Sequence, residues 1–356
     1  MSKALASVCM ICYTVGTTVA GEFRTRRLTP PVVEGRWVRP SSETPAQPVW
    51  GHAQGLRVGL APLPGPRGLL RIYAPQVGLP EGRMINFIAV EPTVAVGSPR
   101  GYSELERSDL DRRQGKRFWS ADNADDATPR SPTRPARGTL LCTNDLETLS
   151  VFVFVEPFKN GTKPYLRLTF RSDRPEEVGI ATFAQPGSKP MHQCILTATM
   201  GNYARLRRLH LEDAVVSSTE LWPAYRGDGF ARPRLFPLSR LWRGAGGEVI
   251  VAATPNEANP GAVDYPSNVP GHWRYRGAVA TQYWRAETPH RGLAALVNGR
   301  FTYWRSQVPI PGGIAYENFE LMARYREGQA FWFGVTRKTP KQLGITPSSS
   351  GFDSDK

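Results

Sequence analysis

Residues 148–185 read TLSVFVFVEPFKNGTKPYLRLTFRSDRPEEVGIATFAQ. Three segments of this stretch, 148–156, 164–172 and 177–185, are rich in the β-branched and aromatic residues that are typical of strands. The run VFVFV is continuously apolar, which suits a strand buried on both faces. Glycine, proline, asparagine and aspartate, the usual turn residues, separate the segments. The stretch therefore predicts successive strands joined by turns.

Similar segments fill most of the remaining chain. The segment 203–212 fits neither the helical nor the strand period cleanly, and we interpret it as a strand. Asn298-Gly299 predicts a type I′ hairpin turn because both positions tolerate positive φ, and Glu327-Gly328 predicts the last hairpin. The expected fold is all-β, an antiparallel β-sandwich of jelly-roll type with long loops. Further strands are expected at 55–61, 68–74, 84–91, 138–144, 191–200, 214–219, 248–254, 272–287, 293–304, 316–325 and 329–337.

The composition supports this fold class. Among 356 residues there are 34 glycines and 32 prolines, which interrupt helices and mark turns. Hydrophobic residues make up 40% of the chain and charged residues 21%, which provides for a core and excludes wholesale disorder. We expect an extended lead-in at 21–48, a single β-sandwich domain at 49–342 and a disordered tail at 343–356.

The amino-terminal segment, MSKALASVCMICYTVGTTVA, predicts a secretory signal peptide at 1–20. Lys3 precedes a moderately apolar stretch, and Thr18-Val19-Ala20 forms a small-x-small cleavage site. A buried amino-terminal helix is the alternative, which Gly16 and the threonines disfavour. The mature chain is therefore expected to be secreted or periplasmic, with no membrane span after removal of the signal.

Removal of the signal peptide would leave Cys142 and Cys194 as the cysteines of the mature chain. In an oxidising compartment they are compatible with one disulfide, and two separately buried thiols are the equal alternative. The histidines are scattered, with no HxxxH or HxH pair, so we expect neither a metal site nor another cofactor.

The formal net charge of +14 indicates association with anions. Residues 271–305, GHWRYRGAVATQYWRAETPHRGLAALVNGRFTYWR, combine arginines with aromatic residues and contain a single acid, Glu287. Strand alternation would place His272 and Arg274 on one face and Trp273 on the other. Arginine binds carboxylates and sulfates bidentately, while aromatic rings offer flat apolar faces to sugars.

This combination has more than one interpretation. Single-stranded nucleic acid also binds to arginines and stacks on aromatic rings. The expected export favours an anionic polysaccharide as the partner, and no nucleic acid is expected. The alternative without a ligand is that the aromatic residues belong to the core and the arginines belong to a solvated surface.

For an enzyme that acts on an acidic glycan, β-elimination fits these residue types best. The reaction needs an Arg, Asn or Gln to neutralise the uronate carboxylate, and a Tyr or His to move protons. The candidate catalytic residues are Tyr203, Arg205, His272, Arg274, Gln282 and Tyr303. The candidate substrate-binding residues are Asn202, Trp273, Trp284, Arg300 and Trp304.

A glycoside hydrolase would instead need two opposed carboxylates. Glu317 and Glu320 are three residues apart, so a regular strand would direct them to opposite faces. This spacing does not favour a hydrolase.

The chain resembles secreted polysaccharide lyases of the concanavalin-like jelly-roll type across residues 138–336. The resemblance lies in the types of the candidate site residues and in the expected arrangement of strands. The segments INFIAVEP, YENFEL and FWFGVT also resemble uncharacterised exported bacterial proteins. The first resemblance implies β-elimination on a uronate-containing glycan. We therefore expect a secreted protein that handles an acidic polysaccharide, with lyase activity as the enzymatic hypothesis. A non-catalytic β-sandwich that binds carbohydrate or another surface polymer is the alternative.

Overall fold

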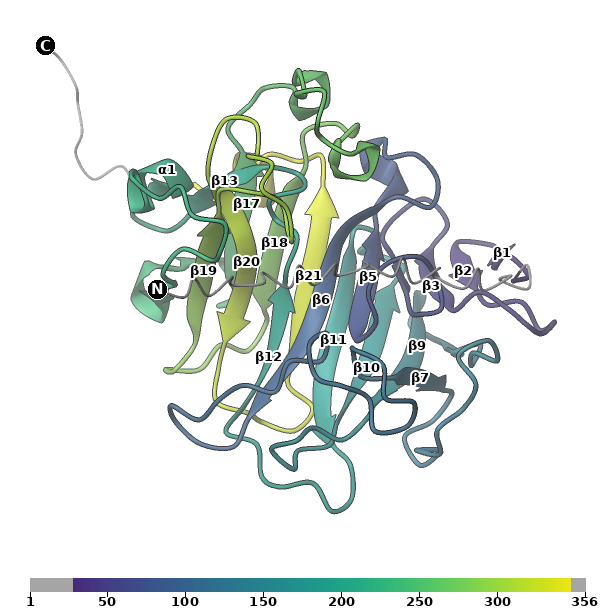
Figure 1. The fold of residues 1–356 in the computed structure, drawn as a ribbon. Coiled ribbons are helices and arrows are strands. Elements are labelled where there is room, and N and C mark those ends of the chain that lie inside the picture. The colour runs from purple at the N-terminus through teal and green to yellow at the C-terminus, as the bar shows by residue number, and fades with distance from the viewer. Residues whose placement is uncertain (1–27, 347–356) are drawn as a thin grey trace, which may run out of the picture.

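The computed structural model describes residues 28–346, so the expected signal peptide and most of the expected tail lie outside the described residues. Two large antiparallel sheets pack against each other with an apolar core between them (Figure 1). This arrangement confirms the expected all-β sandwich. The jelly-roll connectivity stays a prediction.

Within the described residues, the first sheet has ten strands. In order across the sheet they are β1 (Val32–Glu34), β2 (Trp37–Arg39), β3 (Val49–His52), β4 (Arg57–Gly59), β5 (Leu69–Tyr73), β6 (Met84–Thr93), β12 (Gln193–Ala198), β20 (Ala315–Met322), β19 (Ala294–Arg300) and β15 (Arg234–Pro237).

The second sheet has eleven strands over the same part of the chain. Its main path is β14 (Val215–Ser217), β13 (Leu206–His210), β17 (Val249–Pro255), β18 (Thr281–Ala286), β21 (Ala330–Thr336), β11 (Glu177–Ala184), β10 (Pro164–Arg171), β9 (Leu146–Val155) and β7 (Phe118–Ala121). Beside this path, β8 (Thr139–Thr143) pairs with β9, and β16 (Trp242–Arg243) pairs with β17. The helical elements are short: α1 (Ser218–Leu221), η1 (Pro75–Val77), η2 (Leu238–Arg240), η3 (Pro260–Ala262), η4 (Gly271–Trp273) and η5 (Lys341–Leu343).

Strand β10 shows how the sequence pattern produces the layered core. Leu166, Leu168 and Phe170 are buried in the core, whereas Arg167 between them is exposed. The neighbouring strands β9 and β11 pair with β10 on either side, as expected for 148–156 and 177–185. The expectation of a strand within 203–212 is confirmed as well, since β13 lies there.

Polar contacts cross the core and fix the stacking of the two sheets. Trp284 of β18 donates its indole N–H to the carbonyl oxygen of Phe319 in β20 at 2.9 Å. Asn86 of β6 donates to the side-chain oxygen of Gln282 in β18 at 2.6 Å. A buried polar group that loses its partner costs about 1–3 kcal/mol. These bonds therefore favour the observed alignment of the two sheets over alignments in which one sheet is shifted along the other.

Both expected hairpin turns are wrong. Asn298-Gly299 lies within β19, which pairs with β20 on both sides of a bulge at these residues. The Asn298 side chain accepts a hydrogen bond from the Asn318 backbone at 3.1 Å. Glu327-Gly328 lies between β20 and β21, which belong to different sheets. A local turn signal cannot reveal that the chain crosses from one sheet to the other.

Parts of two expected strands are wrong for a similar reason. Residues 272–280 form η4 and irregular backbone, and β18 begins only at Thr281. Residues 301–304 lie in the loop between β19 and β20. Prolines and glycines on either side of η4 interrupt the strand pattern that the aromatic residues suggested.

The expected lead-in takes part in the first sheet through β1 and β2. Arg39 of β2 donates to the carbonyl oxygens of Arg137 and Gly138 at 3.0 and 2.7 Å. These bonds attach the lead-in to the residues that precede β8. At the other end of the chain, Ile345 of the expected tail packs against the outer face of the second sheet.

The two cysteines are free: Cys142 is exposed on β8, and Cys194 is buried on β12. Of the two alternatives, the disulfide is therefore not formed. The alternative of two buried thiols holds for Cys194 only. Burial raises the pKa of the Cys194 thiol to about 12.

Gly334→Ala is expected to destabilise the sandwich by about 1–3 kcal/mol. Gly334 of β21 lies beneath the ring of Tyr283, and a Cβ atom at this position would overlap that ring. Tyr283 is held in place because it is buried and donates to Glu177 at 2.9 Å. Chemical denaturation measures the change. Gly271→Ala, where a Cβ atom would meet open space, should change stability by less than about 0.5 kcal/mol, and equal losses in both variants would contradict the prediction.

Candidate functional site

Four of the expected catalytic residues are enclosed by the fold. Tyr203, Arg205, Gln282 and Tyr303 are buried, as is the expected substrate-binding residue Asn202. A sugar chain cannot contact these side chains in the folded protein. Their placement favours structural roles.

The two buried arginines of β13 and its amino-terminal flank form a clamp. Arg205 and Arg207 both donate to the same carboxylate oxygen of Glu257, at 3.2 and 2.5 Å. Arg205 also donates to the hydroxyl oxygen of Tyr265 and to the carbonyl oxygen of Pro260. The charge of Arg205 is therefore already used in holding the loop that follows β17.

Arg207 makes the corresponding attachment to the loop before β20. It donates to the carbonyl oxygens of Ile314 and Gly313, each at 3.2 Å, and to that of Pro311. Its side chain is fully buried. Removal of this guanidinium would leave several buried acceptors without a donor.

Part of the expected site does come together near this clamp. Trp273 stacks on Tyr303 with ring centroids 5.1 Å apart, and His272 packs against Trp273 at 5.1 Å. Arg274 instead donates to the carbonyl oxygen of Val269 at 3.0 Å. Gln282 and Trp284 lie elsewhere, on the core face of β18. The expected catalytic set is therefore not assembled around an open groove.

The buried tyrosines are poor proton carriers for β-elimination. Burial raises the pKa of Tyr203 and of Tyr303 above the usual range for a phenol. A general base works best with a pKa near the operating pH. These hydroxyl groups are therefore unsuited to abstract a proton from a uronate at neutral pH.

Several polar atoms of the expected site lack a hydrogen-bond partner among the described residues. They are both polar side-chain atoms of Asn202, the hydroxyl oxygen of Tyr303 and the Nε2 atom of Gln282. Buried polar groups of this kind are commonly satisfied by internal water.

The remaining two expected binding residues, Arg300 and Trp304, belong to a partly exposed patch at the end of β19. One part of it comes from the loop at 222–233 and the other from β19 and the loop at 301–314. We call the following side chains the arginine–aromatic patch: Arg226, Phe230, Arg300, Phe301, Trp304 and Arg305.

Arg300 holds the two parts of the patch together. Its guanidinium carbon lies 5.2 Å from the ring centre of Phe230 and 5.1 Å from that of Trp304. It also donates to the carbonyl oxygen of Thr302 at 3.1 Å and to that of Asp228. Because Arg300 is itself buried, it positions the rings and offers little charge to solvent.

Arg226 and Arg305 supply the exposed charges of the patch. Arg226 lies 5.1 Å from the ring centre of Phe301, and Arg305 lies 5.9 Å from that of Trp304. Phe230 beside them is 44% exposed. No carboxylate of residues 28–346 forms an ion pair with Arg226 or Arg305, which donate to backbone carbonyls and to an amide oxygen. The patch therefore presents uncompensated positive charge beside flat apolar rings.

A second arginine cluster, on the outer face of the second sheet, differs because its charges are compensated. Arg174 and Arg285 lie 5.5 and 5.1 Å from the ring centre of Trp332. Both donate to one carboxylate oxygen of Glu287, at 2.6 and 2.8 Å, and Arg285 also pairs with Glu177. A pocket of about 440 Å³ borders this cluster. Its paired charges suit an anionic ligand less well than those of the arginine–aromatic patch.

The sequence patterns did not predict that the carboxylates of Glu91 and Glu320 on the first sheet are buried. Glu91 of β6 and Glu320 of β20 both accept from one nitrogen of Arg100, at 2.6 and 3.0 Å. Burial, followed by the proximity of Glu320, raises the pKa of Glu91 to about 8. Burial also raises the pKa of Glu104 to about 7. Glu91 and Glu320 are enclosed, so this group stabilises the loop that carries Arg100 and does not meet a glycan.

The expectation that Glu317 and Glu320 face opposite sides of a strand is wrong. Tyr316 and Phe319 both pack in the core, although a regular strand would separate residues three apart. The bulge between β19 and β20 lies at this position and resets the alternation. Burial raises the pKa of Glu317 to about 8, and Arg300 partly opposes this effect.

Comparison with known protein families, with curated proteins and with solved structures finds no match. Within residues 28–346, no group of three or more His, Cys, Asp or Glu side chains is arranged to hold a metal ion. No helix in the same range combines the length and the apolar character needed to cross a membrane.

Proposed function

We propose that this chain is an exported, non-catalytic β-sandwich protein that binds an anionic polysaccharide through the arginine–aromatic patch. The observation that carries the proposal is the pairing of unneutralised guanidinium groups with partly exposed rings. Arg226 and Arg305 provide the charges, and Phe230 and Trp304 provide the rings.

The chemistry of the patch fits a polymer with carboxylate or sulfate groups. A guanidinium group forms paired hydrogen bonds with either anion, and the sugar ring between anions offers C–H groups to an aromatic face. The sequence-based expectation of export supports a glycan over a nucleic acid as the partner. The net charge of +14 adds long-range attraction for any polyanion.

The enclosure of four of the six expected catalytic residues supports binding over β-elimination. Arg205, one of the candidate arginines for neutralising the uronate, is buried and paired with Glu257. Tyr203 and Tyr303 are buried with raised pKa values, so they do not supply a base near neutral pH. The proposed protein therefore holds the polysaccharide without cleaving it.

Arg226→Ala/Arg305→Ala is expected to weaken binding to a polyuronate by at least about tenfold, which corresponds to about 1.4 kcal/mol. The two exposed charge-assisted contacts would be lost while the buried Arg300 keeps the loops in place. Isothermal titration calorimetry with polygalacturonate and with dextran sulfate measures the change. Affinity of the wild type should fall as salt is raised.

The matched control is Arg324→Ala/Arg326→Ala, which removes the same charge beyond the opposite end of β20. This variant should bind nearly as tightly as the wild type. Equal weakening in both variants would show that net charge, and not the patch, is responsible. Tighter binding to oligothymidylate than to either polysaccharide would reassign the partner to nucleic acid. Release of unsaturated uronate, seen by ultraviolet absorbance, would restore the lyase hypothesis.

A further inference from the structure

Strand β8 has an unprotected edge. Within residues 28–346 it pairs only with β9, through the turn Asn144-Asp145, whose residues have φ of 49° and 62°. All residues of β8 are exposed, and Leu141 is 61% exposed. Residues 138–144 carry neither charge nor proline, the usual protections of an edge strand. By contrast, the edge strand β15 contains both arginine and proline.

The outward backbone groups of β8 are available for pairing. Thr143 and Leu146 flank the two-residue turn and exchange its closing hydrogen bonds. Alternation then directs the N–H and C=O groups of Leu140 and Cys142 away from β9. No described residue supplies a backbone partner for these groups. Such an edge is a template for another strand.

The sequence of β8 is suited to pairing with itself. Thr139-Leu140-Leu141-Cys142-Thr143 is nearly palindromic about Leu141. Antiparallel pairing about this centre places Thr139 opposite Thr143 of a second copy, and Leu140 opposite Cys142 of that copy. The outward groups of Leu140 and Cys142 would then form about four hydrogen bonds.

Charge does not oppose this register. The strands themselves are uncharged, so two chains of net charge +14 can approach along β8 without placing cations against each other. The pairing brings Asp145, at the turn, opposite the backbone of Arg137 in the second copy, whose guanidinium already pairs with Glu34 of its own chain.

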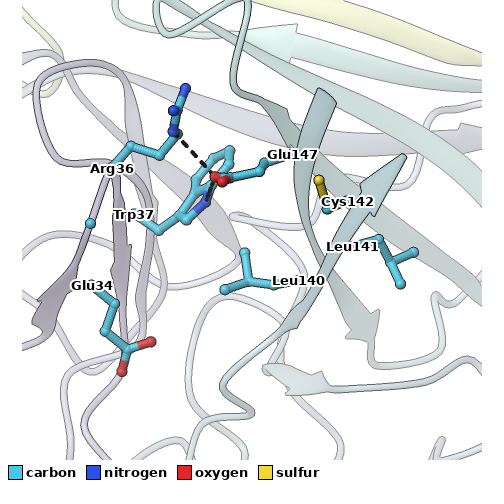
Figure 2. A pocket seen from close by; sticks show the side chains of 8 residues that line it. Glu34, Arg36, Trp37, Leu140, Leu141, Cys142 and Glu147 are labelled. Atoms are coloured by element: carbon cyan, nitrogen blue, oxygen red, sulfur yellow. Dashed lines mark hydrogen bonds and ion pairs between the residues drawn. The ribbon is translucent and has the colours of Figure 1, made fainter. Parts of the chain in front are cut away.

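We infer that this chain forms a twofold-symmetric dimer in which the β8 strands of two copies pair antiparallel and join their second sheets. A pocket of about 690 Å³ lies between β8 and the hairpin of β1 and β2. Figure 2 shows Leu140 extending from β8 toward Trp37, and Leu140, Leu141 and Cys142 all line the pocket. One wall of the pocket is fixed by Glu147, which accepts from Trp37 at 3.0 Å and pairs with Arg36 at 3.2 Å. This space accommodates side chains that the second copy adds on the Leu140 face.

The dimer would leave the arginine–aromatic patch open. Figure 1 places β9 and β1 at one side of the molecule and β19 and α1 at the other. The two copies would then expose two patches, and a polymer that spans both would gain affinity by multivalency. The dimer itself does not depend on the proposed ligand.

Sedimentation velocity of the purified full chain over a range of micromolar concentrations tests the dimer. We expect the wild type to dimerise, and Leu141→Lys to weaken dimerisation by at least tenfold because two ammonium groups would meet on the symmetry axis. The matched control is Leu235→Lys in edge strand β15, where the leucine is 58% exposed, and it should dimerise like the wild type. A wild type that remains monomeric, or a dimer that persists in Leu141→Lys, overturns the inference.

Disulfide cross-linking tests the register in a Cys142→Ser background. Leu141→Cys should give an intermolecular disulfide, because facing residues at a non-hydrogen-bonded position have Cα atoms about 4.5 Å apart. Thr143→Cys should not, since its counterpart in the second copy would lie roughly 14 Å away along the strand. Cross-linking at position 143 and not at position 141, seen on a non-reducing gel, overturns the proposed pairing.

Discussion

Arg207→Ala is expected to lower the free energy of unfolding by about 3–5 kcal/mol, the cost of breaking a buried ion pair from one side. Arg207 is fully buried and donates to Glu257 at 2.5 Å and to the carbonyl oxygen of Ile314 at 3.2 Å. Alanine would leave these acceptors without their donor and would open a space the size of the side chain. Urea or guanidinium denaturation of the wild type and of the Arg207→Ala variant measures the difference in the free energy of unfolding.

The controls separate the clamp from a general effect of charge. Arg324→Ala removes an exposed arginine and should change stability by less than about 0.5 kcal/mol. Arg205→Ala should be destabilising as well, and the double variant should lose less than the sum, because both arginines bind the same oxygen of Glu257. A loss below about 1 kcal/mol in Arg207→Ala would show that the clamp is dispensable.

Stability is expected to fall as the pH rises through the neutral range, and Glu317→Gln should reduce this loss. Burial raises the pKa of Glu317 from 4.5 to about 8. Between these values the unfolded chain releases the proton while the folded protein keeps it, so raising the pH favours unfolding. The slope for one such carboxyl is about 1.4 kcal/mol per pH unit. Below the lower value both states hold the proton, and above the higher value both have lost it.

Thermal or chemical denaturation across about pH 5 to pH 8 measures this slope. Glutamine resembles the protonated acid, so the variant should lose less stability over this range than the wild type. Glu91, whose pKa is also raised to about 8 by burial, should maintain part of the slope. Glu327→Gln, at an exposed position, is the matched control and should follow the wild type. Identical slopes for Glu317→Gln and the wild type would rule out Glu317 as a source of the pH dependence.

The candidate site was only partly predictable, and the reason differs from residue to residue. The window at 271–305 contains both Arg300 and Trp304, which contact each other in the structure. It could not identify Phe230, because this ring comes from a loop about 70 residues earlier in the chain. Trp284 has the same sequence signature as Trp304, but it lies in the core.

The burial of charged groups and the identity of their partners could not be predicted from the sequence, for a related reason. Arginine is seldom fully buried, so no sequence signal indicates that Arg205 and Arg207 are enclosed. Glu257 compensates both, yet it lies about 50 residues away in the chain. In the same way, Glu91 and Glu320 become neighbours only because β12 pairs with both β6 and β20.

Local sequence determined the existence of most strands, the absence of long helices in the described range and the all-β class, because strand propensity and turn chemistry act over a few residues. Tertiary structure alone decided which strands share a sheet, which arginines are buried and which remain exposed beside aromatic rings. These properties depend on pairing between distant segments, and the periodicity of a single strand carries no record of its partners.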